Sequence, residues 1–267
     1  MKQKTVLAVD IGNTTVALGL FQGKRLARHG KMLTHQFPTQ QAWQRILAQW
    51  LHQRKIVSTQ VDTCIICSVV PKTLSLLHPV LKKLIPPRAM SDKRRSRALW
   101  VVGTDLKVPI PNLYRDPQQV GQDRLVNAYS GYVQYGAPLI LVDFGTAVTF
   151  DIISKKGEYL GGLITPGLEM ACQALAEKTA LLPRVKVSPP RQIIGKTTQE
   201  SIQSGMFYGW GALSDGVVAL LRKRIGPAKV ILTGGQAKTV SLFIQSPHQV
   251  NPYLILEGLY LLAKKSL

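Results

Sequence analysis

The sequence predicts an α/β protein made of two similar halves with a cleft between them. Short apolar strand-like runs alternate with helix-like segments along the chain. Apolar residues make up 45% of the 267 residues and charged residues 18%, which excludes a disordered chain or a coiled coil. A strand followed by Asp-x-Gly and a second strand occurs twice, at Asp10 and at Asp143, half the chain apart.

The first half predicts strands at 5–9, 16–21 and 64–70, and helices at 39–54 and from Pro71 to Pro86-Pro87. Apolar residues at helical spacing indicate the helix at 39–54, and a continuous apolar run indicates the strand at 64–70. Pro71 suits the first position of a helix. The Arg- and Lys-rich residues 88–97 predict a solvated segment, and residues 104–117, with three prolines, predict a connector.

The second half predicts helices at 123–135, 168–178 and 202–221, and strands at 139–142, 148–153 and 230–233. Residues 155–157 predict a turn after the strand at 148–153. Because the second half repeats the pattern of the first, we expect two domains, at residues 1–115 and 116–267. Ligands commonly bind in clefts between such domains.

The charge and cysteine content limit the partners and the compartment. The chain carries 34 Lys and Arg against 14 Asp and Glu, a net charge of +20 that attracts nucleic acid or small phosphorylated ligands. The basic run Lys93–Arg97 has no nucleic-acid-binding motif around it, so a solvated loop is the usual explanation. Cys64 and Cys67 predict buried strand residues rather than a zinc or redox pair. Without a membrane segment or signal-peptide core, we expect a cytoplasmic protein.

Two loops carry residues suited to phosphate. In the first, Gly12 lets backbone N–H groups approach an anion, and Thr14 and Thr15 offer hydroxyls to phosphate oxygens. Asp10, at a strand end, suits a hydrated divalent cation. The second loop, Asp143–Ala147, repeats this chemistry, so two loops facing each other could clamp the β- and γ-phosphates of ATP. The alternative for each loop is an ordinary hairpin turn.

Three further motifs allow a functional or a plain structural explanation. The glycines of Gly161–Gly167 permit close backbone approach, and Thr233–Gly235 ends a strand in an open ledge for a nucleoside. Both are also compatible with simple strand-to-helix turns. Asp123 beside Arg124 suits a site that binds an acid and deprotonates an alcohol, although a salt bridge at a helix start explains the pair equally.

Taken together, these motifs resemble the type III pantothenate kinases, members of the acetate and sugar kinase/Hsc70/actin superfamily, from Val9 to Gly258. Asp10–Thr14 is similar to the family's first phosphate motif and Asp143–Ala147 to its second. Leu232–Gly235 is similar to its adenosine motif. Gly121-Gln122-Asp123-Arg124 is similar to its pantothenate motif, in which the family more often has Ala at the position of Gln122.

The resemblance implies a fold of two duplicated actin-like (ribonuclease H-like) domains with an interdomain cleft. It implies ATP-dependent phosphorylation of pantothenate to 4′-phosphopantothenate, the first step of coenzyme A biosynthesis. It also implies a homodimer that uses Mg2+ with ATP and a monovalent cation, K+ or NH4+.

Residue roles follow from the same resemblance. The ATP-binding residues it implies are the first motif, the residues directly after it, and three positions of the second half: Asp10, Ile11, Gly12, Asn13, Thr14, Thr15, Val16, Ala17, Thr146, Gly234 and Gly235. The implied pantothenate-binding residues are Tyr114, Gly121, Gln122, Asp123, Arg124 and Thr198. Asp123 would be the general base and Arg124 would pair with the pantothenate carboxylate. Asp143 would bind K+, and Asp10 would hold Mg2+ through water.

Two other functions remain open at this point. A regulatory, nucleic-acid-associated homologue could keep the fold without turnover, and the charge of +20 favours it. Against it, the carboxylates and glycines that catalysis needs are present, so nucleic acid is not the expected partner. A sugar or acetate kinase of the same superfamily is the second possibility.

Overall fold

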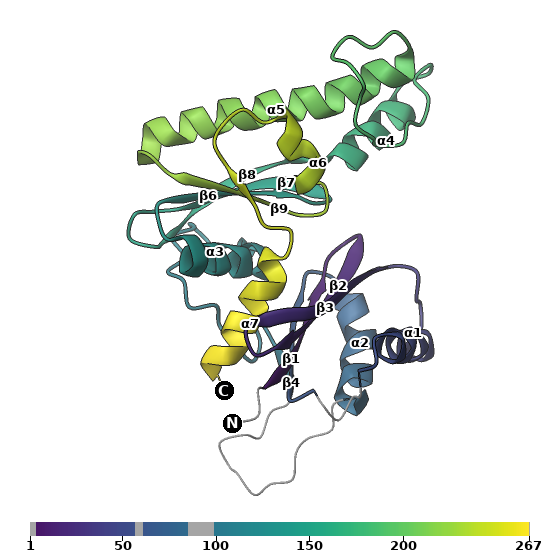
Figure 1. Cartoon of the computed structure of the whole chain (residues 1–267), viewed down its shortest axis with the longest axis vertical. Coiled ribbons are helices and arrows are strands. Elements are labelled where there is room, and N and C mark those ends of the chain that lie inside the picture. The colour runs from purple at the N-terminus through teal and green to yellow at the C-terminus, as the bar shows by residue number, and fades with distance from the viewer. Residues whose placement is uncertain (1–3, 57–60, 85–98, 267) are drawn as a thin grey trace, which may run out of the picture. The chain divides into compact units, whose positions relative to one another are not determined.

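The computed structural model describes residues 4–56, 61–84 and 99–266, and Figure 1 labels their elements. The chain forms two compact units. The first comprises Met1–Pro109, Gln118–Ser130 and Ile255–Leu267, and the second comprises Ile110–Pro117 and Gly131–Leu254. The first unit therefore includes two segments from the predicted second domain, residues 116–267. The division into duplicated domains at residues 115 and 116 stays a prediction.

The first unit is built on a five-stranded sheet in the order β3-β2-β1-β4-β5. The strands are β1 (Thr5–Ile11), β2 (Thr15–Gln22), β3 (Arg25–Leu33), β4 (Thr63–Ser68) and β5 (Leu99–Val101). β1, β2 and β3 form an antiparallel meander, and β4 and β5 are parallel to β1. β1, β2 and β4 are apolar almost throughout, which suits strands that are covered on both faces.

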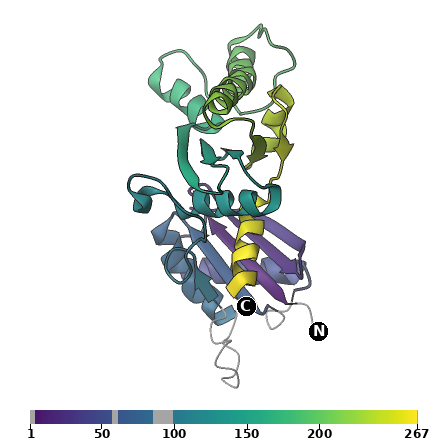
Figure 2. The same cartoon turned by 90° about the vertical axis from the view of Figure 1, so that its left-hand side faces the viewer.

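Helices cover both faces of this sheet (Figure 2). On one face, α1 (Gln40–Gln53) and α2 (Pro71–Leu84) bury a core that includes Trp43, Leu47 and Leu77. On the other face lies α7 (Leu254–Ser266), whose Tyr260 ring stacks on Phe21 with centroids 4.7 Å apart. The first half of α3 (Gln122–Tyr135) packs against α7 in the same unit.

The second unit repeats this arrangement in the order β8-β7-β6-β9-β10. Its strands are β6 (Leu139–Phe144), β7 (Ala147–Ile153), β8 (Tyr159–Pro166), β9 (Lys229–Thr233) and β10 (Gln249–Val250). The other elements are η2 (Pro117–Gln119) at the end of the connector, and α4 (Leu168–Lys178), α5 (Thr198–Ile225), α6 (Ala237–Val240) and η3 (Ser241–Phe243). The pairing again runs antiparallel over three strands and parallel over the remaining two.

The shared strand order confirms the α/β fold with two actin-like halves. In each sheet the central strand carries an aspartate one residue before its end, Asp10 in β1 and Asp143 in β6, and a hairpin leads directly into the next strand. The repeated Asp-x-Gly pattern therefore marks the same point of the same topology in both units. The carboxyl ends of these central strands are the usual ligand edge of a sheet with parallel connections.

Several elements differ from the sequence-based expectation. The edge strand β3 was not expected, because exposed polar and basic residues break its apolar pattern. Gly161–Gly167 is not a connector but most of β8 and the cap of α4. Helix α7 was missed as well. The expected helix end at Pro86-Pro87 and the solvated run 88–97, including Lys93–Arg97, lie outside the described residues.

Other features of the described residues bear on ligands and surfaces. No helix among them is long and apolar enough to cross a membrane.

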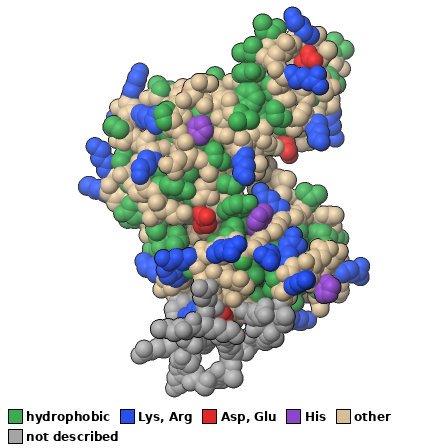
Figure 3. Space-filling view, viewed as in Figure 1, with side chains coloured by type: hydrophobic (Ala, Val, Ile, Leu, Met, Phe, Trp, Pro, Cys, Tyr) green, Lys and Arg blue, Asp and Glu red, His purple; other side chains and the backbone are tan. Residues whose placement is uncertain are grey.

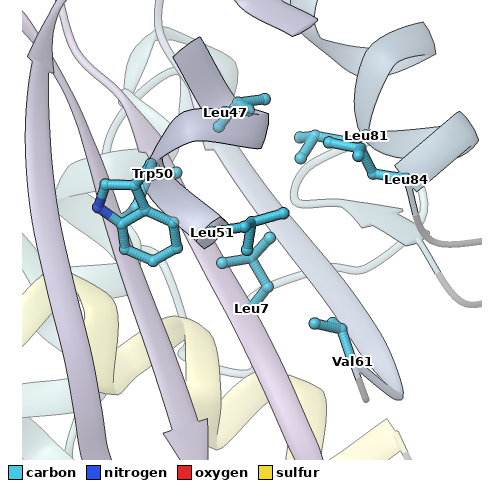
Figure 4. Close-up of a pocket in the computed structure, with 8 residues that line it drawn as sticks. Leu7, Leu47, Trp50, Leu51, Val61, Leu81 and Leu84 are labelled. Atoms are coloured by element: carbon cyan, nitrogen blue, oxygen red, sulfur yellow. The ribbon is translucent and has the colours of Figure 1, made fainter. Parts of the chain in front are cut away.

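An apolar pocket under α1 and α2 is lined by Leu7, Leu18, Leu47, Trp50, Leu51, Val61, Leu81 and Leu84 (Figure 4). It carries no titratable group, so it is a packing feature of the core. Lys and Arg side chains are spread over the face seen in Figure 3, with few acidic side chains among them.

Candidate functional site

The first candidate loop is a tight turn between β1 and β2. The Gly12 N–H donates to the Thr15 carbonyl at 3.0 Å, which closes the turn and leaves Asn13 and Thr14 exposed. Asp10 is half-buried and lies beside Ala17 of β2. The loop thus presents backbone, amide and hydroxyl groups to solvent next to one carboxylate, a surface that suits a phosphate group and its cation.

Thr34, which the sequence motifs did not indicate, stabilises this loop through two hydrogen bonds. The Thr34 hydroxyl donates to the Gly12 carbonyl at 2.7 Å, and the Thr34 N–H donates to the Thr14 carbonyl at 3.0 Å. Thr34 is only 2% exposed. Because it lies just beyond β3, far from the motif in sequence, no local pattern could have revealed its role.

The predicted ATP-binding residues of this segment divide by burial. Ile11 and Val16 point into the apolar core under α1 and α2, and Ala17 is buried on the opposite face. Any contact of these three residues with a nucleotide would therefore come from the backbone. Asn13 and Thr14 are exposed.

The predicted pantothenate motif forms the start of α3. The Arg124 N–H donates to the Asp123 Oδ1 at 2.9 Å and to the Gly121 carbonyl at 3.1 Å. A side chain at Gly121 would collide with the same carboxylate oxygen of Asp123. The Gln122 side chain, which departs from the family's usual Ala, packs beside Gly103. The first turn of a helix thus fixes Asp123, as the sequence indicated.

Asp123 has the electrostatic surroundings of a proton acceptor. Burial raises the pKa of its carboxyl, and the backbone N–H and the positive charge of Arg124 offset part of that rise. A carboxylate with a raised pKa holds a proton more readily than an exposed one, which is the property a general base near neutral pH needs.

Two carboxylates of the first unit, those of Asp10 and Asp123, act electrostatically on Cys67. It lies on β4 directly beside Asp10 of β1 and is fully buried. Burial raises the pKa of the Cys67 thiol, and the negative charges of Asp10 and Asp123 raise it further. The charges of Asp10 and Asp123 therefore both act on one buried thiol, although the two residues are more than 100 residues apart in the sequence. Cys64 and Cys67 are both buried, as expected for strand cysteines.

The second candidate loop is built mainly from backbone. Asp143 is half-buried and lies next to Thr233 in the parallel pairing of β6 and β9. Gly234 has a φ of +92°, which favours glycine, and a side chain there would collide with the Asp143 carboxylate and lie 2.6 Å from the Phe144 carbonyl oxygen. The strand end after Thr233 and the loop after Asp143 thus meet at one carboxylate.

The rest of this loop is held by main-chain hydrogen bonds. The Gly145 N–H donates to the Ala147 carbonyl at 3.2 Å, and the Gly167 N–H donates to the Thr146 carbonyl at 3.1 Å. Gly145, Thr146 and Gly235 are exposed. The structure therefore places three predicted features of the second half together: the Asp143–Ala147 loop, which includes Thr146, and the glycines Gly234 and Gly235.

Tyr114 and Thr198 occupy other parts of the second unit. The half-buried Tyr114 follows a short stretch of chain that pairs with the start of β8, and its ring lies against Gly161. Thr198 is exposed and begins α5, beside α4, while Thr197 caps the helix by accepting from the Glu200 N–H at 3.2 Å. Thr198 and Tyr114 thus belong to different elements, the start of α5 and the segment that precedes η2.

The carboxylates of the two loops suit cations that take most of their other oxygen ligands from a bound phosphate compound and water. No group of three or more His, Cys, Asp or Glu that could hold a metal occurs among the described residues. Each loop instead offers a single half-buried carboxylate, at Asp10 or Asp143. Mg2+ keeps several waters and commonly uses one carboxylate plus substrate phosphates, so Asp10 fits it. The space that Gly234 leaves beside Asp143 suits a second cation with oxygen ligands.

Comparisons with known proteins agree with this geometry. A family model for the type III pantothenate kinases matches residues 6–220. The chain is 38% identical to a type III pantothenate kinase of Persephonella marina and covers 96% of both chains. It is 39% identical to one of Syntrophotalea carbinolica, over 96% of this chain and 97% of that one. A Campylobacter jejuni protein described as a Baf family transcriptional activator matches at a TM-score of 0.56 and 19% identity, over 97% and 98% of the two chains, which shows the fold alone.

Proposed function

The chain belongs to the type III pantothenate kinases, which phosphorylate pantothenate with ATP in the first step of coenzyme A biosynthesis, and we propose how its residues divide that reaction. The observation that carries the proposal is the Asp123 carboxylate at the start of α3, which accepts from the Arg124 N–H at 2.9 Å and has a pKa raised by burial. The same unit carries Asp10, so the proposed proton acceptor and the proposed cation-binding carboxylate belong to one unit.

Asp123 acts as the general base. Its carboxylate accepts the proton of the pantothenate hydroxyl while the hydroxyl oxygen attacks the γ-phosphorus. The bond between that phosphorus and the bridging oxygen breaks, and ADP leaves. Arg124 pairs with the pantothenate carboxylate, and Tyr114, Gly121, Gln122 and Thr198 contact the same molecule. The raised pKa of the Asp123 carboxyl supports this role.

The two loops hold the triphosphate. Asp10–Ala17 and Thr146 contact its phosphates, and Gly234 and Gly235 make a ledge for the nucleoside. Asp10 holds Mg2+ through water, and Asp143 binds the monovalent cation, K+ or NH4+. These ions neutralise charge on the phosphates, which is the main electrostatic requirement of phosphoryl transfer. The cleft in which the two loops face each other is part of the proposal.

The protein works as a homodimer through the surface of α4 and α5. Met170 on α4 and Leu213 and Leu220 on α5 are large exposed apolar side chains. Exposed apolar surface of this kind commonly marks a protein interface. Thr198, at the exposed start of α5, would then contact pantothenate in the partner's site. Cytoplasmic localisation stays a prediction.

An ADP-release assay with and without pantothenate and K+ tests the function. We expect ADP release that requires ATP, Mg2+ and pantothenate together and that depends on K+. Release with a sugar or acetate instead of pantothenate would indicate another kinase of the superfamily. Salt-sensitive nucleic-acid binding without ADP release would indicate the regulatory alternative, which no finding favours.

A further inference from the structure

The segment that carries Tyr114 is hydrogen-bonded to a buried residue of the second unit, Tyr159. The Tyr159 N–H donates to the Pro111 carbonyl at 2.8 Å, and the Leu113 N–H donates to the Tyr159 carbonyl at 2.9 Å. Residues 111–113 therefore lie beside the first residue of β8 like a short added strand. The position of Tyr159 sets the position of this segment.

The ladder of β7 and β8 alone does not fix Tyr159. The pairing passes from Ile152 opposite Gly161 to Ile153 opposite Tyr159, so Leu160 is an extra residue. Gly161, with a φ of +121°, completes this bulge. Bulges disrupt the local hydrogen bonding and re-aim side chains, and they are common next to active sites. Beyond the bulge, the Ser154 N–H donates to the Glu158 carbonyl at 2.8 Å, and a contact of the Tyr159 side chain adds to this hold on the strand end.

That contact is a buried hydrogen bond to Asp151. The Tyr159 hydroxyl donates to the Asp151 Oδ1 at 2.8 Å, and the Thr149 hydroxyl donates to the Oδ2 at 3.0 Å. Tyr159 is fully buried and Asp151 is 1% exposed. A carboxylate in this position is costly unless its oxygens are hydrogen-bonded, so the pair is held in one geometry.

The exposed side of the segment is fixed by Asn112. Its Oδ1 accepts from the Tyr114 N–H at 3.0 Å, and its Nδ2 donates to the Pro117 carbonyl at 3.2 Å. The Tyr114 ring then rests on the open face of Gly161, where an added Cβ would lie 3.3 Å from its Cδ2. Asp151, Tyr159 and Asn112 thus determine where Tyr114 stands.

We propose that Asp151 and Tyr159 are positioning residues for pantothenate, acting through residues 111–113 on Tyr114. The inference rests on the proposed contact between Tyr114 and pantothenate. It assigns a purpose to a buried carboxylate that the chemistry of phosphoryl transfer does not use. It also explains why a bulge and a left-handed glycine occur together at the start of β8.

Tyr159→Phe tests the proposal because it removes only the hydroxyl. We expect the KM for pantothenate to rise about threefold to tenfold, as for one lost hydrogen bond, with kcat and the KM for ATP within about twofold of the parent. Tyr135→Phe is the matched control, since it removes a hydroxyl that accepts from Asn251 in the same unit. It should leave all three constants unchanged. Asp151→Asn keeps an acceptor for Tyr159 and should stay near the parent.

Two further variants separate the possible failures. Tyr114→Ala tests the underlying contact: an unchanged KM for pantothenate would remove the role proposed for Tyr114. If Tyr114→Ala raises the KM but Tyr159→Phe does not, the positioning inference alone is wrong. In the Tyr114→Ala background, Tyr159→Phe should have no further effect, because both act through one side chain; a full additional effect would overturn the inference. Should Tyr159→Phe fail to fold, Asn112→Ala, at the surface, is expected to raise the same KM.

Discussion

Asp10 and Asp143 end the central strands of two sheets with the same strand order, yet their surroundings differ. Around Asp10 side chains surround the strand end: Cys67 lies beside it in the sheet, and the Thr34 hydroxyl holds the loop that follows by donating to the Gly12 carbonyl. Around Asp143 the neighbours are glycines and main-chain carbonyls.

The difference indicates how a repeated unit came to serve one reaction. The first unit supplies the acid–base group, because buried side chains there can shift a pKa. The second unit supplies a close-fitting cradle, because Gly234 lets the chain approach the carboxylate. Substitution of Asp123 should therefore change the chemical step, and substitution of Gly234 should change ATP binding.

Asp123→Asn should have the largest effect. The amide keeps the size of the side chain but cannot accept a proton at neutral pH, so kcat should fall at least about 10²-fold. Steady-state kinetics with saturating ATP and pantothenate measures the loss. Arg124→Ala serves as the comparison in the same motif. It should act mainly by raising the KM for pantothenate, because it removes a charge-assisted pair present before the chemical step.

The pH dependence sharpens the same point. Burial raises the pKa of Asp123, and only the deprotonated carboxylate can accept a proton. On acidification, kcat should therefore begin to fall at a higher pH than it would if the base were a carboxyl with an ordinary pKa. The charged form is disfavoured in the folded state, so this group's contribution to stability is full below its unfolded pKa and is lost as pH rises through its folded pKa. Asp123→Asn at neutral pH should thus unfold at the same temperature as the parent or higher. A marked drop in the Tm of Asp123→Asn would contradict the claim that burial disfavours the charged form of Asp123.

Gly234→Ala should have the next largest effect and should act on binding. A methyl group there meets the Asp143 carboxylate and forces a non-glycine residue to a φ of +92°. We expect the KM for ATP to rise about tenfold or more, since strain of this kind costs about 1–3 kcal/mol. Gly216→Ala in α5 is the matched control, because nothing lies within 4 Å of its added methyl. An equal change in both variants would argue against a cradle at Gly234.

Replacement of K+ by Na+ tests whether the Asp143 carboxylate binds a monovalent cation. If Asp143 shares K+ with the phosphates, the rate should fall on the order of tenfold, which corresponds to about 1.4 kcal/mol of lost stabilisation. Asp143→Asn should abolish the difference between the two salts. Equal rates of the parent protein in K+ and Na+ would remove the monovalent site.

Thr34→Val should have the smallest effect. It keeps the shape of the side chain but removes the hydroxyl that donates to the Gly12 carbonyl. Loss of one such hydrogen bond should raise the KM for ATP about twofold to tenfold and leave kcat nearly unchanged. Thr39→Val, which removes the α1 cap hydroxyl that accepts from the Ala42 N–H, is a control that lowers stability without touching the loop. A loss confined to kcat would show that the hydrogen bond from Thr34 to Gly12 affects the chemical step and not ATP binding.

The sequence alone predicted those parts of the site that depend on neighbouring residues. Strand ends, the Asp-x-Gly turns and the start of α3 follow from local apolar patterns and turn chemistry, and Asp10, Asp123 and Asp143 were found in this way. The resemblance to a family, rather than any pattern, indicated Tyr114 and Thr198.

What the sequence could not predict depends on pairing between distant segments. Thr34 meets the first loop only because β3 returns along β2, and Cys67 meets Asp123 only when α3 packs near β4. Asp151 and Tyr159 are joined across a bulge that no local motif marks. Such contacts follow from strand register, which a single sequence specifies only weakly.

Calorimetric titration of ATP with Mg2+ into Asp123→Asn and Gly234→Ala, set beside their kcat values, tests the division of labour most directly. We predict that Asp123→Asn binds ATP within about twofold of the parent while its kcat is at least about 10²-fold lower, and that Gly234→Ala shows weakened ATP binding instead. Turnover by Asp123→Asn within a few fold of the parent would contradict the account, and Asp123 would then be only a charged residue at the start of a helix.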